Sequence, residues 1–354
     1  MTGLKDLLLR KIAANGPMTL ADYMSECLLH PQFGYYTTRD PLGASGDFTT
    51  SPEISQIFGE LLGLCLAQAW LDHGAPETFT LAELGPGRGT LMADILRAGA
   101  AVPGFLTAAR VYLLEVSQNL REKQRQMLAG QDVQWIETIA DLPDAPLCLV
   151  ANEFFDALPI RQFTRDRQGW RETQVGAVDH YLAFGLSAPA PIAVLDHRLA
   201  DTEPGDIVEI CPQAEPIVLE ISDRISRHGG VALLIDYGDW RSLGDTFQAV
   251  RHHKTEHPLA WPGMADLTAH VDFEALATAA KGVDVTPLTP QGIVLERLGI
   301  SARANALARR LQGPALDSHF AAHRRLTHPT EMGTLFKMIA FHHPGSPLPP
   351  GFVQ

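Results

Sequence analysis

The sequence predicts an α/β fold with a doubly wound parallel sheet, and two features of the chain support this class. From residue 79 onward, short apolar runs alternate with segments of helical periodicity, which is typical of right-handed βαβ units. In addition, the glycine-rich segment 85–89 lies between the first apolar run and the first helical pattern of this region. Such junctions are where open α/β sheets bind their ligands.

Length and composition set the broad class of the protein. The chain has 354 residues, which corresponds to about two domains or to one large domain with an insertion. With 45% hydrophobic and 19% charged residues it can form a sizeable core. The net charge of -13 argues against nucleic acid as the main partner, because nucleic-acid binding depends on clustered lysine and arginine.

The region before residue 76 is predicted to be mainly helical. This region includes a long loop with several glycine and proline residues, which contains Gly46 and Asp47. We expect this loop to close over a cofactor as a lid, because long loops in compact domains are commonly functional. Its last residues, Ser51-Pro-Glu53, are also consistent with an ordinary helix start. Three helical patterns are present, at residues 4–14, 19–28 and 53–72.

Alternating strands and helices follow. From about residue 160 to 210 the pattern of apolar and turn residues predicts an inserted antiparallel β element. We therefore divide the chain into a helical N-terminal cap with the lid loop, residues 1–75, and a cofactor-binding core, residues 76–354, that carries the insertion. The predicted strands are TFTLAEL, RVYLLEV, VQWIE, LCLVANEF, VALLIDYG and LFKMIAFHH, and the predicted helices are 90–98, 118–128, 213–227, 272–281, 291–298 and 302–312.

Cysteine usage and the lack of targeting patterns indicate the compartment. The four cysteines are far apart and form no C-x-x-C or Cys/His spacing, which fits a reducing environment. No run of about 18 apolar residues is present, so we expect no membrane insertion. The spacing of Leu4, Leu7 and Leu8 is typical of a short amphipathic helix of the fold rather than of a presequence. We expect a cytoplasmic protein, or a mitochondrial matrix protein if the source is eukaryotic.

Residues 81–90, LAELGPGRGT, form the strongest functional motif. Gly85, Gly87 and Gly89 place G-x-G-x-G between a strand and a helix, where the backbone must turn sharply and approach a ligand closely. The dinucleotide fingerprint has the different spacing G-x-G-x-x-G. Glu83 would repel a diphosphate, but it suits the cationic amino group and sulfonium of S-adenosylmethionine. We therefore predict a Rossmann-like S-adenosylmethionine site, with a purely structural turn as the alternative.

A second acid supports the same cofactor. Glu115 lies at the end of the next predicted strand, RVYLLEV. A carboxylate there can accept hydrogen bonds from both ribose hydroxyls, as the acid about 20 residues after the glycines does in dinucleotide folds. Taken alone, Glu115 is equally consistent with a surface acid at the end of a strand.

The strand LCLVANEF ends in polar residues that we expect to hold the methyl acceptor. Asn152, Glu153 and Asp156 follow apolar residues abruptly at the carboxyl edge of the sheet. The segment 152–155 is similar in layout to the Asn-Pro-Pro-aromatic signature of amino-group methyltransferases, although both prolines are absent. A carboxylate here can bind a guanidinium through a bidentate charge-assisted pair. The alternative is that the phenylalanines are core residues and Glu153 has a capping role.

Two further groups of polar residues have less specific patterns. Asp266, Thr268 and His270 precede a predicted helix, where capping explains them as well as a functional role does. The pairs His252-His253 and His342-His343 would point to opposite faces if they lay in strands, so we expect no metal site.

Several segments in their order along the chain resemble the MidA family of class I methyltransferases. The resemblance covers roughly residues 17–340 and implies a seven-stranded methyltransferase sheet, a helical N-terminal cap, an inserted substrate-side element and S-adenosyl-L-methionine as the cofactor. One departure is Phe247, where leucine is expected. By position, the resemblance assigns Gly85, Gly87 and Gly89 to the cofactor loop, Glu115 to the ribose, and Glu153 and Asp156 to the acceptor edge. The segments are GDFTTSPEISQIFGE, ELGPGRG, LLEVSQNLREKQ, ANEFFDALPIRQF, LLIDYG, ADLTAHVDF and QGIVLERLGI.

The MidA resemblance also implies an acceptor. Mitochondrial members of the family include the complex I assembly factor that methylates an arginine of a core NADH dehydrogenase subunit. The resemblance therefore suggests symmetric dimethylation of a protein arginine, with an NADH dehydrogenase subunit as the protein partner. The residues themselves do not identify the acceptor. A methyltransferase acting on a small molecule, and an assembly chaperone that binds the cofactor without transfer, remain alternatives.

Overall fold

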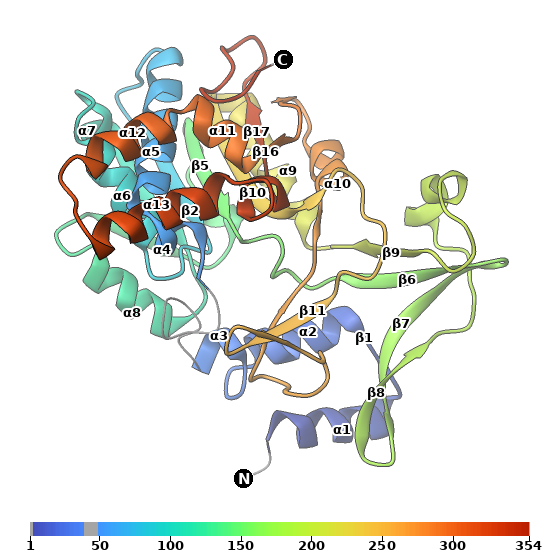
Figure 1. The fold of residues 1–354 in the computed structure, drawn as a ribbon. Helices are drawn as coiled ribbons and strands as arrows, with labels where there is room; N and C mark the ends of the chain where they lie inside the picture. The colour runs from blue at the N-terminus through green and yellow to red at the C-terminus, as the bar shows by residue number, and fades with distance from the viewer. Residues whose placement is uncertain (1–2, 39–48, 354) are drawn as a thin grey trace. The chain divides into compact units, whose positions relative to one another are not determined.

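The computed structural model describes residues 3–38 and 49–353, and the chain forms two compact units that alternate along the sequence (Figure 1). The insert unit comprises residues 1–48, 156–215 and 241–272, and the sheet unit comprises residues 49–155, 216–240 and 273–354. Each unit has its own hydrophobic core. The division into residues 1–75 and 76–354 follows sequence pattern alone and stays a prediction.

The sheet unit is built on a mostly parallel sheet with the strand order β15-β17-β10-β5-β2-β3-β4. Neighbouring strands from β10 to β4 are parallel, whereas β17 is antiparallel to β10 and β15. The short strand β16 also pairs with β17. This sheet confirms the predicted doubly wound α/β class. The strands are β2 (Phe79–Leu84), β3 (Ala109–Leu114), β4 (Val133–Ile136), β5 (Leu147–Asn152), β10 (Gly230–Asp239), β15 (Asp284–Val285), β16 (Thr289–Pro290) and β17 (Phe336–His342).

The central strands are mostly apolar and are buried along their whole length because they are covered on both faces. Every residue of β2 and of β5 is buried. Parallel strands in such a position lack the alternation of an exposed strand. From β2 the chain passes to β3 and β4 on one side, and then returns to β5 on the other side of β2. The carboxyl ends of β2 and β5 therefore flank the topological switch point, where doubly wound sheets bind ligands.

Most predicted helices of the sheet unit are present, with bounds shifted by a few residues. The helix predicted at 53–72 is interrupted at Ser55, whose backbone is extended with φ -156° and whose hydroxyl accepts the N–H of Ile57. Helix α13 was not among the predicted helices. The helices are α4 (Ser51–Ile54), α5 (Gln56–Asp72), α6 (Thr90–Gly99), α7 (Phe105–Ala108), α8 (Gln118–Met127), α9 (Ala214–His228), α10 (Phe273–Ala279), α11 (Gln291–Arg297), α12 (Ile300–Ala308), α13 (Pro314–Thr327) and α14 (Met332–Leu335).

The insert unit contains the predicted antiparallel β element. One sheet has the order β1-β7-β6-β9, with β8 paired to β7, and all of these pairs are antiparallel. A second sheet has the order β12-β11-β13. The elements are α1 (Leu4–Asn15), β1 (Met18–Thr19), α2 (Leu20–Leu29), α3 (Tyr35–Thr38), β6 (Arg161–Asp166), β7 (Gly169–Val178), β8 (Tyr181–Leu186), β9 (Ile207–Ile210), β11 (Gln248–Arg251), β12 (Lys254–Glu256), β13 (Asp266–Thr268) and β14 (Val271–Asp272).

Two hairpins of the insert unit turn without the usual glycine. The turn between β11 and β12 is made by His252 and His253, with φ of 51° and 59°, and the turn between β7 and β8 by Asp179 and His180, with φ of 46° and 64°. Positive φ at both central residues normally selects Asn-Gly or Asp-Gly. The sheet of β11, β12 and β13 was therefore not predicted from the sequence. The assumption that His252 and His253 could lie in a strand was wrong.

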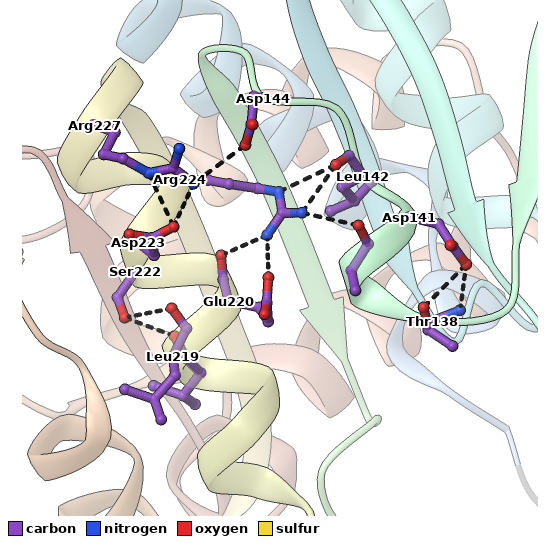
Figure 2. A network of polar contacts seen from close by, with 12 residues as sticks. Thr138, Asp141, Leu142, Asp144, Leu219, Glu220, Ser222, Asp223, Arg224 and Arg227 are labelled. Carbon is purple, nitrogen blue, oxygen red and sulfur yellow. Dashed lines mark hydrogen bonds and ion pairs between the residues drawn. The ribbon is translucent and has the colours of Figure 1, made fainter.

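A buried arginine connects α9 to the segment that leads into β5. Arg224 is 4% exposed, and its guanidinium donates to the carbonyls of Ala140 at 3.2 Å and Leu142 at 2.9 Å. It also donates to the carboxylate of Glu220, one turn earlier on α9, at 2.6 Å. Figure 2 shows these hydrogen bonds of Arg224 as dashed lines. Because buried carbonyls need a donor, Arg224 fixes the turn that precedes the central strand β5.

Replacing Arg224 by methionine should lower the free energy of unfolding by about 3 kcal/mol, because the carbonyls of Ala140 and Leu142 would be left without this donor. Urea unfolding followed by circular dichroism measures the change. Arg227→Met is the matched control, since Arg227 lies on the same helix with an exposed side chain that contacts Asp144 and Asp223. We expect the control to keep the wild-type midpoint. Equal midpoints for wild type and Arg224→Met would show that the network does not stabilise the fold.

Candidate active site

The loop after β2 is held in a conformation that only glycine adopts easily. Gly85, Gly87 and Gly89 have φ of 62°, 54° and 86°, all in the left-handed region. Helix α6 begins directly after them at Thr90. Because glycine has no Cβ, the chain can turn from strand to helix here and its backbone can approach a ligand closely. The predicted glycine loop therefore has the backbone geometry that its sequence indicates.

The first glycine also permits a close contact with the end of β5. A Cβ at Gly85 would lie 2.9 Å from Cδ2 of Phe154. Phe154 is the second residue after β5, so its ring packs where a side chain at Gly85 would be. The glycine loop and the edge after β5 are thereby in direct contact within the sheet unit.

Glu83 lies on β2, two residues before Gly85. Its side chain is 3% exposed, and the carboxylate accepts the backbone N–H of Met92 in the first turn of α6. Burial raises the pKa of Glu83 to about 8, and Asp94 adds to the shift. Its Oε2 atom has no hydrogen-bond partner among the described residues. Glu83 thus ties β2 to α6, and its predicted role beside the cofactor's amino group stays a prediction.

Glu115 follows β3, the strand next to β2. Its Oε1 accepts the N–H of Ser117 at 2.7 Å and its Oε2 accepts Nε2 of Gln124 at 3.2 Å. Burial raises the pKa of Glu115 to about 7, while these hydrogen bonds and the charge of Arg121 oppose the shift. A buried, oriented acid at this place fits the predicted role of accepting the ribose hydroxyls.

Gln124 is a residue that the sequence analysis did not single out. Its side chain is fully buried in α8, and Nε2 donates to the carbonyl of Gly87 at 2.7 Å as well as to Glu115. The signal in the sequence was present but weak, because Gln124 ends the segment LLEVSQNLREKQ used for the family resemblance.

The polar edge after β5 begins with a strained residue. Glu153 has φ of 52°, which is uncommon for a residue other than glycine. Its N–H donates to the carbonyl of Ile235 at 2.9 Å. Its Oε1 accepts the N–H of Ser51 at 2.9 Å and the side-chain amide of Asn152 at 3.1 Å. Strained residues held by several contacts are concentrated at functional sites, which favours a role for Glu153 beyond capping.

Asp236 supports this edge and was also missed by the sequence analysis. It is 1% exposed, and its Oδ2 accepts the backbone N–H groups of Phe154 at 3.2 Å and of Phe155 at 3.0 Å. The segment LLIDYG carries the signal, since a lone acid interrupts an apolar strand. Asp236 therefore shapes the turn that positions Phe154.

The start of α4 contacts both the polar edge and the glycine loop. Ser51 donates its N–H to Glu153, as described above, and Glu53 accepts the hydroxyl of Thr90 at 2.5 Å. The predicted lid residues Gly46 and Asp47, which precede α4, lie outside the described residues. Segment 51–54 is consequently fixed at two points of the candidate site.

Asp156 belongs to the insert unit and has a different set of neighbours. It is 6% exposed, and its carbonyl accepts the N–H of Ala269 at 3.0 Å. In the same unit the hydroxyl of Tyr36 donates to Asp266 at 2.7 Å. Burial raises the pKa of Tyr36, and the charges of Asp266 and Asp156 raise it further. Asp156, Asp266 and Tyr36 therefore interact electrostatically, and both aspartates are buried.

Of the other two residues of that sequence cluster, Thr268 is buried and His270 is partly exposed. Thr268 is 5% exposed at the end of β13. The N–H of His270 donates to the hydroxyl of Thr246 at 2.8 Å. Across residues 3–38 and 49–353, no three His, Cys, Asp or Glu side chains are grouped as a metal site requires. Over the same ranges, no helix has the length and apolarity to cross a membrane.

The residues around the switch point fit S-adenosylmethionine. Besides Oε2 of Glu83, Oδ1 of Asn152 is a buried acceptor without a hydrogen-bond partner among the described residues. Acceptors and acids suit a ligand that carries an ammonium and a sulfonium, because hydrogen bonds and opposite charge favour the cation. Glu115 in turn offers carboxylate oxygens to a ribose. An antiparallel strand, β17, next to β10 in an otherwise parallel sheet completes the pattern of a class I methyltransferase.

Comparison with known proteins gives the family. The chain belongs to the family described as "putative S-adenosyl-L-methionine-dependent methyltransferase", whose model matches residues 61–291. This confirms the resemblance to MidA proteins, the methyltransferase activity and S-adenosyl-L-methionine as the cofactor.

Curated relatives and a solved structure extend over nearly the whole chain. The human "Protein arginine methyltransferase NDUFAF7, mitochondrial" is 40% identical, with 94% of this chain and 82% of the human protein covered. The Drosophila melanogaster homolog is 35% identical, with 93% and 82% covered. A Burkholderia thailandensis protein, crystallised with S-adenosyl-homocysteine, is 29% identical with a TM-score of 0.85, and 98% of this chain and 93% of that chain are covered.

Replacing Gly85 by alanine should weaken S-adenosyl-homocysteine binding at least about tenfold, because the new Cβ meets Phe154 and the left-handed φ becomes strained. Isothermal calorimetry on the full chain measures the affinity. Gly130→Ala is the control, since Gly130 has φ of 86° but nothing within 4 Å of the added Cβ. If Gly85→Ala binds S-adenosyl-homocysteine with wild-type affinity, the contact between Gly85 and Phe154 has no role in cofactor binding.

The affinity for S-adenosyl-homocysteine should rise about tenfold between pH 6 and pH 8, because only ionised Glu115 accepts both ribose hydroxyls and its pKa is about 7. Glu115→Gln should bind more weakly and lose this part of the pH dependence. Titrations at several pH values compare the two proteins. The same rise with pH in wild type and Glu115→Gln would exclude Glu115 as the titrating group.

Proposed function

We propose that this methyltransferase transfers one methyl group to each of the two terminal guanidinium nitrogens of a protein arginine, giving symmetric dimethylarginine on an NADH dehydrogenase subunit. The observation that carries the arginine assignment is the set of relatives named protein arginine methyltransferase, which align with 94% of this chain in the human protein. The NADH dehydrogenase part rests on the MidA resemblance, whose mitochondrial members include a complex I assembly factor.

The reaction defines what the protein must supply. A guanidinium is a weak nucleophile because it is cationic and its nitrogen lone pairs are delocalised. One nitrogen forms a bond to the methyl carbon while the bond from that carbon to sulfur breaks, and one proton leaves the nitrogen. S-adenosylmethionine supplies the methyl group on a sulfonium leaving group. The protein must therefore bind the guanidinium, align one nitrogen and accept a proton.

We assign these tasks to the polar residues at the carboxyl end of β5. The carboxylate of Glu153 is oriented by the N–H of Ser51 and the amide of Asn152, both on Oε1. A carboxylate oriented in advance loses little entropy when it pairs with a guanidinium. In the proposal Glu153 binds the acceptor and takes the proton, and Asn152 orients Glu153. Asp156 belongs to the insert unit, and its predicted role at the acceptor edge rests on the sequence alone.

The compartment is also part of the proposal. The curated relatives are named as mitochondrial proteins, and nothing in their names supports the cytoplasm. We propose the mitochondrial matrix for a eukaryotic source and the cytoplasm for a bacterial source.

Replacing Glu153 by glutamine should reduce methyl transfer about a hundredfold or more, because the neutral amide neither pairs with the guanidinium nor accepts its proton. S-adenosyl-homocysteine affinity should stay at the wild-type value. Glu122→Gln is the control, since the Glu122 side chain is 62% exposed on α8. Unchanged turnover in Glu153→Gln would remove Glu153 from the mechanism, and lost cofactor binding would assign it to the cofactor site.

The acceptor itself is tested with methyl-labelled S-adenosylmethionine. The purified chain is incubated with labelled cofactor and an extract that contains the unmethylated client, and the label is located by mass spectrometry. Label on arginine of an NADH dehydrogenase subunit supports the proposal. Label on lysine or in a non-protein fraction contradicts the arginine assignment, and no transfer to any component favours an assembly protein without catalysis.

A further inference from the structure

One buried amide joins the two halves of the cofactor site. Gln124 lies on α8 with no exposed surface. Its Nε2 donates to the carbonyl of Gly87 in the glycine loop at 2.7 Å and to Oε2 of Glu115 at 3.2 Å. The loop after β2 and the acid after β3 are thus connected through a single side chain.

The orientation of this amide is fixed by a third partner. The indole Nε1 of Trp135, on β4, donates to Oε1 of Gln124 at 2.8 Å. An indole N–H can only donate, so the amide oxygen must face Trp135 and the amide nitrogen must face the cofactor site. Both hydrogens and the oxygen of the amide are then used. Since every polar atom is satisfied, the network is rigid rather than strained.

Hydrogen bonds from Ser117 and Gln124 act directly on the carboxylate of Glu115. Ser117 holds Oε1 and Gln124 holds Oε2, so both oxygens are positioned while their remaining lone pairs can accept further hydrogen bonds. The two donors favour the ionised carboxylate, which is otherwise opposed by burial. Arg121 is the cation that acts on Glu115, and its Nε donates to the Glu115 carbonyl at 2.7 Å.

Gln124 also lies against the last glycine of the loop. A Cβ at Gly89 would be 3.5 Å from both Cα and Cγ of Gln124. The helix that carries Gln124 is therefore packed on the loop at the point where α6 begins. A change at residue 124 reaches the loop through packing as well as through the hydrogen bond to Gly87.

We propose that Gln124 is a positioning residue for S-adenosylmethionine, which sets the cofactor affinity by orienting the ribose acid Glu115 and the carbonyl of Gly87 together. This inference does not depend on the methyl acceptor. It is tested by binding alone, so its outcome is independent of whether the arginine assignment holds.

The test is calorimetric titration of the full chain with S-adenosyl-homocysteine at pH values from 6 to 9. Gln124→Leu keeps the size of the side chain but removes the donors, and its affinity should fall about tenfold to a hundredfold. Its rise in affinity with pH should also move to higher pH than in wild type, because Glu115 loses a donor that favours ionisation. Gln126→Leu is the matched control, since Gln126 is on the same helix and exposed. Both variants keep Arg121.

A shift of the affinity profile to higher pH distinguishes a positioning role of Gln124 from general damage to the fold. General damage would weaken binding equally at every pH. Wild-type affinity with an unshifted profile in Gln124→Leu would overturn the proposal, as would a loss that is the same at all pH values. Should Gln124→Leu fail to fold, Gln124→Glu replaces it. The added acid beside Glu115 should again move the rise to higher pH, and a profile that superimposes on wild type would overturn the proposal.

Discussion

The packing of Phe154 against Gly85 is the contact on which the arrangement of the candidate site depends. A side chain at Gly85 would meet the ring at 2.9 Å, so the loop can take its position only as glycine. The ring is held in place because the N–H of Phe154 donates to Asp236, 82 residues further along the chain. One glycine, one aromatic ring and one carboxylate therefore connect the carboxyl ends of β2 and β5 to residue 236 of β10.

Two buried acids near this edge make the stability of the fold depend on pH. Burial raises the pKa of Glu83 to about 8 and of Glu115 to about 7, both above the ordinary value of 4.5. Because the pKa is raised in the folded state, the folded protein binds more protons than the unfolded chain between pH 4.5 and the raised pKa of each acid. This contribution to stability is complete below pH 4.5 and is lost as the pH rises through 7 to 8. A cationic ligand offsets the cost of ionising these acids.

The sequence predicted the parts of the site that have a local pattern. The glycine loop, the acids Glu83 and Glu115, and the polar end of β5 are each read from a few adjacent residues. Asp236 and Gln124 were missed because their function is defined by partners on other strands, and no local spacing reports such contacts. The turn at His252 and His253 was missed for a different reason, since its left-handed backbone is taken by residues that rarely adopt it.

We propose that the switch point between β2 and β5 holds the cofactor, with Glu115 on the ribose. A crystal structure of the full chain with S-adenosyl-homocysteine tests this most directly. We predict that both ribose hydroxyls donate to the Glu115 carboxylate while Gln124 still contacts Gly87. A ribose bound away from Glu115, with the glycine loop unoccupied, would contradict the claim.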